Sequence, residues 1–169
     1  MFVLGIDPGL SRCGYGVVTR RGSTLSAVAG GVVSTAPEMP LHLRLRVLSV
    51  ELRALVAEYR PAAVVVERVF FQVNARTAMA TGMAAGVALV AAAQSGCQVA
   101  QYTSNEVKQA LVGYGAATKD QVQRMVASVL GLAEAPRPPD VADALALATC
   151  HLTIQPLRRA VAAATEGAS

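Results

Sequence analysis

The chain has 169 residues, of which 53% are hydrophobic and 15% are charged, and its formal net charge is +4. This length and composition predict a single folded domain with a core of its own and exclude an intrinsically disordered chain. The positive charge favours a polyanionic partner only weakly, because many basic proteins bind no nucleic acid. The three cysteines form no CxxC motif, and Asp7 and Pro8 interrupt the apolar N-terminus. We therefore expect a cytoplasmic protein with reduced thiols and no signal peptide.

The first third of the sequence predicts an antiparallel meander followed by a helix. Three apolar runs are typical of strands: residues 2–7, 12–19 and 26–34. The polar residues 20–23 predict the turn between the second and third strands. Prolines then indicate a loop, after which leucines recur at helical spacing from Leu41 to about Tyr59, and Pro61 ends this helix.

The remaining two thirds alternate between short apolar runs and helical patterns. Residues 62–67 predict a buried parallel strand because their valines form a continuous run, and residues 98–101 predict a fifth strand. Ser104 and Thr118 are the expected N-caps of two of the later helices. Helices are predicted over residues 75–94, 104–112, 118–130 and from Asp140 to about residue 152 or beyond.

This order of elements predicts an α/β fold with a mixed five-stranded sheet flanked by helices. We expect one domain over residues 1–157 and a flexible C-terminal tail over residues 158–169. Residues 77–93 carry no charge and approach the length of a membrane-spanning helix. They are mostly alanine, glycine, threonine and methionine, so we predict a buried, close-packed helix and no membrane association.

Four acidic residues stand at the ends or starts of apolar elements. Asp7 and Glu67 each end a predicted strand, and they meet at one sheet edge if those strands are parallel neighbours. Asp140 and Asp143 are three residues apart in the first turn of a helix, so both face one side. Structural roles are open for each acid: Asp7 as a turn residue, Asp140 as an N-cap, and Glu67 as a partner of Arg68.

Carboxylates that gather in a small volume repel one another unless a cation joins them. Oxygen ligands of this kind suit hard cations, above all Mg²⁺. Two such ions about 4 Å apart activate water and stabilise the leaving oxygen in phosphodiester hydrolysis. The pattern therefore indicates a metal-dependent nuclease.

Five segments, in order and spread over residues 2 to about 152, resemble the RuvC family of crossover (Holliday) junction endodeoxyribonucleases. Some members carry histidine at the position of Asp140, where this chain keeps an aspartate. The segments are GIDPGLSRCGYG (5–16), VERVFF (66–71) followed by Asn74, VKQALVG (107–113), KDQVQ (119–123) and DVADALA (140–146).

The resemblance implies a ribonuclease H-like fold and a homodimer that cuts two opposed strands of a four-way DNA junction at symmetric points. It implies roles in homologous recombination and DNA repair, and a branch-migration partner of the RuvA–RuvB type. Products would carry 5′-phosphate and 3′-hydroxyl ends. The cofactor would be Mg²⁺, two ions per subunit, with Mn²⁺ as a possible substitute. The catalytic and metal-binding set would be Asp7, Glu67, Asp140 and Asp143.

The resemblance also implies residues that bind DNA. Phe70 and Phe71 follow Glu67; we expect one of them, Phe70, to stack on an unstacked base, and the other to be buried in the core. The expected backbone contacts are Asn74, Arg76, Lys108 and Lys119. Small residues around Gly82 and Gly86 predict a helix with one face on the sheet and the other on a second subunit.

Three other functions fit part of the pattern. A YqgF-type ribonuclease H-like nuclease shares the first segment but lacks the paired lysines and the full terminal motif. An actin-like ATP-binding module would use Asp7 at a phosphate, but that fold needs two such domains and this chain is too short. A junction-binding protein that does not cut would have no need of all four acids.

Overall fold

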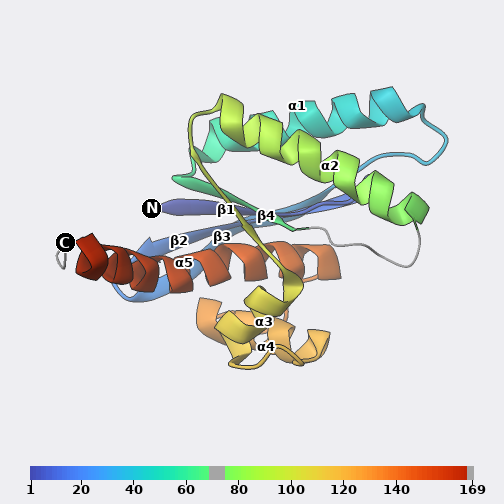
Figure 1. Cartoon of the computed structure of the whole chain (residues 1–169). Helices are drawn as coiled ribbons and strands as arrows, with labels where there is room; N and C mark the ends of the chain where they lie inside the picture. Colours follow the sequence, from blue (N-terminus) through green and yellow to red (C-terminus); the bar gives the residue numbers. More distant parts are fainter. Residues whose placement is uncertain (69–74, 167–169) are drawn as a thin grey trace.

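A computed structural model describes residues 1–68 and 75–166, and of residues 156–166 it describes the backbone alone. Its five strands form one mixed sheet in the order β3-β2-β1-β4-β5 (Figure 1). β1, β2 and β3 form an antiparallel meander, while β4 is parallel to β1 and β5 is parallel to β4. The strands are β1 (Phe2–Asp7), β2 (Arg12–Arg21), β3 (Thr24–Ser34), β4 (Ala63–Glu67) and β5 (Gln98–Tyr102).

Helices cover both faces of this sheet, which confirms the predicted architecture. α1 and α2 pack on one face, and α5 packs on the other with α3 and α4 beyond it (Figure 1). The helices are α1 (Leu41–Tyr59), α2 (Ala75–Gln94), α3 (Ser104–Val112), α4 (Lys119–Leu130) and α5 (Pro139–Glu166).

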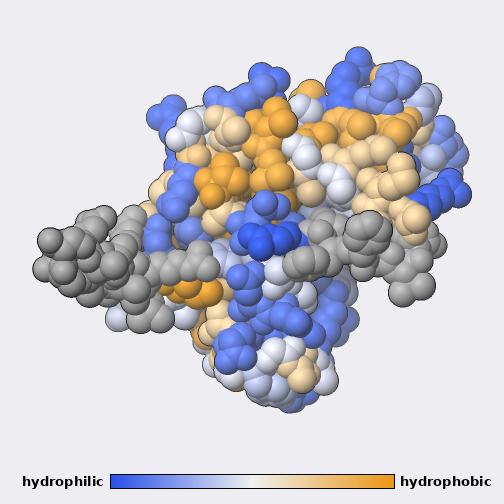
Figure 2. Space-filling model, viewed as in Figure 1, coloured by the Kyte–Doolittle hydropathy of each residue, from blue (hydrophilic) through white to orange (hydrophobic). Residues whose placement is uncertain are grey.

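α2 is buried on one face only. It packs against α1, β4 and β5 through alanines from Ala84 to Ala92. Its other face exposes Met79, Met83 and Val90, and Figure 2 shows apolar surface gathered over this helix. By length and composition α2 could cross a membrane, although core helices of soluble proteins meet the same criteria. The predicted packing of one face on the sheet is therefore confirmed, and the packing of the opposite face on a second subunit stays a prediction.

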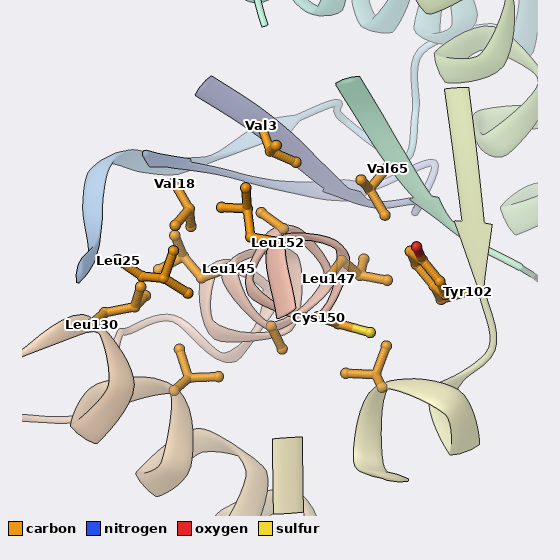
Figure 3. Packing of buried hydrophobic residues seen from close by; sticks show 14 of the residues in the cluster. Val3, Val18, Leu25, Val65, Tyr102, Leu130, Leu145, Leu147, Cys150 and Leu152 are labelled. Atoms are coloured by element: carbon orange, nitrogen blue, oxygen red, sulfur yellow. The ribbon is translucent and has the colours of Figure 1, made fainter. Parts of the chain in front are cut away.

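The two apolar cores meet at β4. Val65 packs into the cluster around α5, which Figure 3 shows, together with Val3, Leu145 and Leu147. The neighbouring valines of β4 point to the opposite face and pack with α1 and α2. This two-sided burial explains the continuous valine run of β4, and it holds the end of the strand in place.

The hairpin between β2 and β3 is tighter than predicted. Arg20 and Arg21 were assigned to the turn, but they pair with Leu25 and Thr24 in the sheet. The turn itself is limited to residues 22–23, with Gly22 at φ +60°. A glycine in this left-handed conformation suits a two-residue hairpin loop, so both arginines extend the strand.

One of the two predicted helix caps is correct. Thr118 caps α4, but α3 is capped by Thr103 rather than by Ser104. The Thr103 hydroxyl accepts a hydrogen bond from the Glu106 backbone N–H (3.1 Å), and the Glu106 carboxylate accepts one from the Thr103 N–H (2.7 Å). Ser104 has a valine three residues later, which cannot complete such a pair.

α5 extends well past residue 152. It begins at Pro139, close to the expected start at Asp140, and continues to Glu166, in agreement with a helix predicted to reach about residue 152 or beyond. Residues 158–166 are therefore helical in the structure. The assignment of residues 158–169 to a separate flexible tail stays a prediction.

Candidate active site

Asp7 and Glu67 lie at the same edge of the sheet. They end β1 and β4, which are parallel neighbours with Ile6 opposite Val66. The residues that precede both acids are fully buried, so the two strand ends are held rigidly. The sequence predicted this meeting, because the carboxyl ends of neighbouring parallel strands share an edge.

α5 brings Asp140 and Asp143 to this edge because glycines clear its path. A Cβ atom on Gly5 of β1 would lie less than 3.0 Å from the backbone oxygen of Ala144, and one on Gly14 of β2 would lie less than 3.0 Å from the backbone of Asp140. The helix backbone therefore rests directly on two strands. A larger residue at either position would hold α5 away from the sheet.

The four carboxylates influence one another's ionisation. Burial, followed by the negative charges of Glu67, Asp143 and Asp140, raises the pKa of Asp7 to about 7. Burial also raises the pKa of Glu67, and the charge of Asp143 adds to the increase. A hydrogen bond between the two carboxyl groups, with the proton on Asp7, works in opposite directions on their pKa values. A pKa of about 7 places the ionisation of Asp7 near neutral pH.

Two cations sit on the other two acids. Arg12 Nη2 lies 2.8 Å from Asp140 Oδ2, and this hydrogen-bonded ion pair lowers the pKa of Asp140. Lys119 Nζ lies 2.5 Å from Asp143 Oδ2. Burial alone would lower the pKa of Lys119, but the hydrogen bond and charge of Asp143, with Asp7 and Asp140, raise it overall. Among the described residues, no ion pair joins Glu67 to Arg68, so that structural role is not supported.

The donor set fits a divalent cation that prefers oxygen. All four groups are carboxylates, and burial together with the negative charges of the other three acids raises the pKa of Asp7. Within the described ranges, no three acidic, histidine or cysteine side chains are arranged as a metal-binding group. Because Asp140 and Asp143 are held by Arg12 and Lys119, a cation would compete with these two side chains for their carboxylates.

A cleft of about 320 Å³ opens beside the acids. It places Lys108 and Lys119 with Glu67 and Asp143, as expected for residues that would hold DNA near the site. Arg76, in contrast, lies in the first turn of α2 and lines a different groove. Three predicted contacts lie outside the described residues: Phe70, Phe71 and Asn74.

Arg12 is a site residue that the sequence did not single out. It appeared only as part of the first segment, although its partner Asp140 is 128 positions away. The available signal was its place five residues after Asp7, across a tight turn that returns the chain towards the strand end. The turn returns the chain to the sheet edge where β1 ends, with Gly14 opposite Asp7.

We predict that the metal-free protein loses stability as the pH rises from about 4 to about 7. Asp7 has a pKa of about 7 in the fold and a value near 3.8 when unfolded, so the native state binds more protons in this window. The loss in the free energy of unfolding is of the order of 2–4 kcal/mol. The lowered pKa of Asp140 changes stability only at pH values below this window, and the raised pKa of Lys119 changes it only at pH values above the window.

Urea unfolding of the wild type and of Asp7→Asn, in EDTA at pH 5 and pH 8, measures this effect. The free energy of unfolding of Asp7→Asn, relative to that of the wild type, should be higher at pH 8 than at pH 5. A difference that is the same at both pH values would contradict a buried, protonated Asp7.

Comparison with known proteins places this site in a family. A family model described as crossover junction endodeoxyribonuclease RuvC matches residues 3–151. A relative from Leifsonia xyli subsp. xyli with the same description is 55% identical over 150 residues, which are 88% of this chain and 72% of the relative. Another, from Salinispora arenicola, is 52% identical over 169 residues, covering 99% of this chain and 97% of the relative.

A solved structure agrees with these relatives. The structure of T. thermophilus RuvC in complex with Holliday junction substrate has a TM-score of 0.87 and 42% sequence identity, and the match covers 92% of this chain and 94% of that one. The fold is therefore ribonuclease H-like, and the actin-like and YqgF-type alternatives are set aside. The family match spans all four acids and both lysine segments. The chain belongs to the RuvC family of crossover junction endodeoxyribonucleases.

Proposed function

We propose that Asp7, Glu67, Asp140 and Asp143 are the catalytic carboxylates with which this protein resolves four-way DNA junctions. The observation that carries the proposal is the convergence of all four acids at one sheet edge, where the pKa of Asp7 rises to about 7. A carboxyl group with such a raised pKa is typical of a functional site rather than of a surface ion pair. Members of the family are divalent-metal-dependent nucleases, and this donor set accounts for that dependence.

Mg²⁺ is the cofactor that the all-oxygen donor set favours, with two ions per subunit and Mn²⁺ as a substitute. Metal ions bound to these carboxylates would supply an activated water and charge stabilisation for the leaving oxygen. Asp7 has to give up its proton before it can act as a ligand, so activity should rise with pH around 7. Arg12 and Lys119 would be displaced by a metal ion held by Asp140 and Asp143, and their charges would then be available to phosphate oxygens.

The lysines of the cleft are proposed to hold the DNA backbone. Lys108 and Lys119 line the same cleft as Glu67 and Asp143, so a phosphate placed there lies within reach of both. Arg76 is proposed to contact the backbone from the start of α2. Phe70 is proposed to stack on an unstacked base, with Phe71 as the alternative, and Asn74 is proposed as a further DNA contact.

A homodimer would supply the two sites that two symmetric cuts require. The exposed face of α2 supports this assembly. Met79 is 62% exposed and Val90 is 56% exposed, and the position where Gly82 would carry a Cβ atom is open. A second copy that packs here would cover the apolar surface seen in Figure 2. The remaining surface would serve a branch-migration partner of the RuvA–RuvB type in the cytoplasm.

The decisive experiment uses a synthetic four-way junction with a short mobile core and labels on all four strands. Wild-type protein with Mg²⁺ should produce paired, symmetric nicks that ligase seals, and the sample should sediment as a dimer at micromolar concentration. Asp143→Asn, and wild type in EDTA, should bind the junction without cutting it, because both lack a complete set of metal-bound carboxylates. Tight binding with no nicks under any metal would instead indicate a junction-binding protein and reject the proposed catalytic set.

A further inference from the structure

A second groove, of about 930 Å³, lies on the side of the sheet covered by α1 and α2. It is formed by the loop after β1, the segment before α1 and the first turns of α2. Arg12 lines this groove and also contacts Asp140 (2.8 Å), so this side chain links the groove to the acid site. The lysine cleft is formed by other elements, α3, α4 and α5, together with the end of β4.

The lining of this groove is basic and apolar. Of the described residues that line it, three are arginines (Arg12, Arg44 and Arg76) and none is acidic, although the chain has 11 acids in total. Apolar side chains form much of the rest, among them Pro37, Met39 and Leu41, while Met79 on the α2 side belongs to the face proposed for the second copy. Such a surface suits a ligand that brings negative charge together with apolar faces.

Arg44 is held in place without an acid. Its Nε donates a hydrogen bond to Thr35 Oγ1 (2.8 Å), and its Nη2 donates one to Ser11 Oγ (2.6 Å). Thr35 is buried and donates in turn to the backbone oxygen of Leu10 (2.6 Å), which fixes the acceptor. Among the described residues, no carboxylate forms an ion pair with Arg44. The guanidinium is thus oriented by neutral hydroxyls, and its charge is left for a ligand.

We propose that this groove holds the sugar–phosphate backbone of the DNA strand next to the cleaved phosphate, with Arg44 and Arg12 as phosphate contacts. Arginine presents several N–H donors in a plane and binds phosphate oxygens in pairs. The apolar residues of the groove accommodate sugar and base faces. The inference rests on the proposed function, since it extends the DNA path from the acid site across the sheet edge.

A second copy of the chain is the competing occupant, because α2 contributes to both the groove and the exposed apolar face. Burial of three arginines against a symmetry-related copy of the same basic groove would leave their charges uncompensated, which is unfavourable. A DNA strand carries one negative charge per nucleotide and meets this requirement. The charge pattern therefore favours DNA.

The test is the salt dependence of junction affinity, measured by fluorescence anisotropy in EDTA, where no cutting occurs. Arg44→Ala should weaken binding about tenfold. It should also reduce the slope of log Kd against log salt by about 0.7–0.9, the value for one lost phosphate contact. Arg53→Ala is the matched control: this exposed arginine lies on the same helix but lines a cavity with Ala62 and Gln98, at the opposite ends of β4 and β5. It should leave the slope unchanged.

A second pair of variants guards against a folding defect in Arg44→Ala. Leu41 is 45% exposed at the start of α1, so Leu41→Glu places an acid in the groove at a helix end that tolerates negative charge. It should weaken junction binding severalfold more than the neutral Leu41→Gln. Dissociation of the dimer by Leu41→Glu, with an unchanged salt slope in Arg44→Ala, would assign the groove to a second copy and overturn the proposal.

Cleavage of the same junction by the wild type in Mg²⁺ separates this inference from the proposed function. Suppose that the wild type cuts the junction and that Arg44→Ala keeps the wild-type slope of log Kd against log salt. This result would reject the groove as a DNA-binding site and leave the proposed function intact. A reduced slope in Arg44→Ala without any cutting by the wild type would support the groove and reject the catalytic assignment.

Discussion

Asp7→Asn should reduce junction cleavage by about a thousandfold or more and raise the melting temperature of the metal-free protein at pH 8 by about 5 °C. Both effects have the same physical origin. Asp7 is half-buried among three other acids, and its pKa of about 7 means that the fold disfavours the ionised carboxylate. That carboxylate is what a divalent cation requires. Asparagine removes the charge, so it relieves the repulsion and removes the ligand together.

Cleavage under single-turnover conditions and thermal unfolding in EDTA measure the two effects on the same preparation. Asp120→Asn is the matched control, because Asp120 is an exposed aspartate that forms an ion pair with Arg124 four residues later on α4. A surface pair of this kind contributes little, so neither quantity should change appreciably. Loss of cleavage with a lower melting temperature would mean that Asp7 is a structural residue.

The parts of the site that follow from local pattern were predictable from sequence. Asp7 and Glu67 end apolar runs, and the run of valines in residues 64–66 correctly indicated a strand covered on both faces. The meeting of their carboxylates then follows from a general property of parallel strands. Local pattern also predicts the Thr118 cap correctly. Ser104 is the wrong hydroxyl for α3, because Thr103 has Glu106 three residues later to complete the reciprocal hydrogen bond.

The parts that depend on long-range packing were not predictable. Nothing near Asp140 in the sequence shows which strand its helix will cross, and Arg12 is its partner only because α5 passes over β2. Gly5 and Gly14 hold that information, but in sequence they are ordinary residues of a strand and a Gly-rich segment. Their role appears only when the helix backbone is seen to occupy the space of the missing side chains.

The exposed face of α2 illustrates a related limit. Its composition indicated a packed helix, and the sheet does bury Ala84, Ala88 and Ala92. Alanine and glycine serve equally well on a face that meets a sheet and on a face that meets a second subunit. The sequence therefore predicts close packing without specifying which partner covers each face.

Gly14→Ala should disable the enzyme without touching an acid. The added methyl group would lie less than 3.0 Å from the backbone of Asp140, which cannot rotate away as a flexible side chain would. The start of α5 must move, and displacement of a catalytic group by about 1 Å is enough to lower activity about a hundredfold. Overpacking at this contact should also lower the free energy of unfolding by about 1–3 kcal/mol.

Gly31→Ala separates the loss of stability from the displacement of the acids. Its methyl group would also lie less than 3.0 Å from a neighbour, but that neighbour is the ring end of the Tyr15 side chain rather than the α5 backbone. This variant should lose stability and keep its cleavage rate once folded. Gly115→Ala, which has open space around the added Cβ atom, should change neither quantity. If Gly14→Ala cleaves the junction as well as Gly31→Ala does, the close contact between β2 and α5 does not position a catalytic group. The contact would then contribute only to the packing and stability of the core.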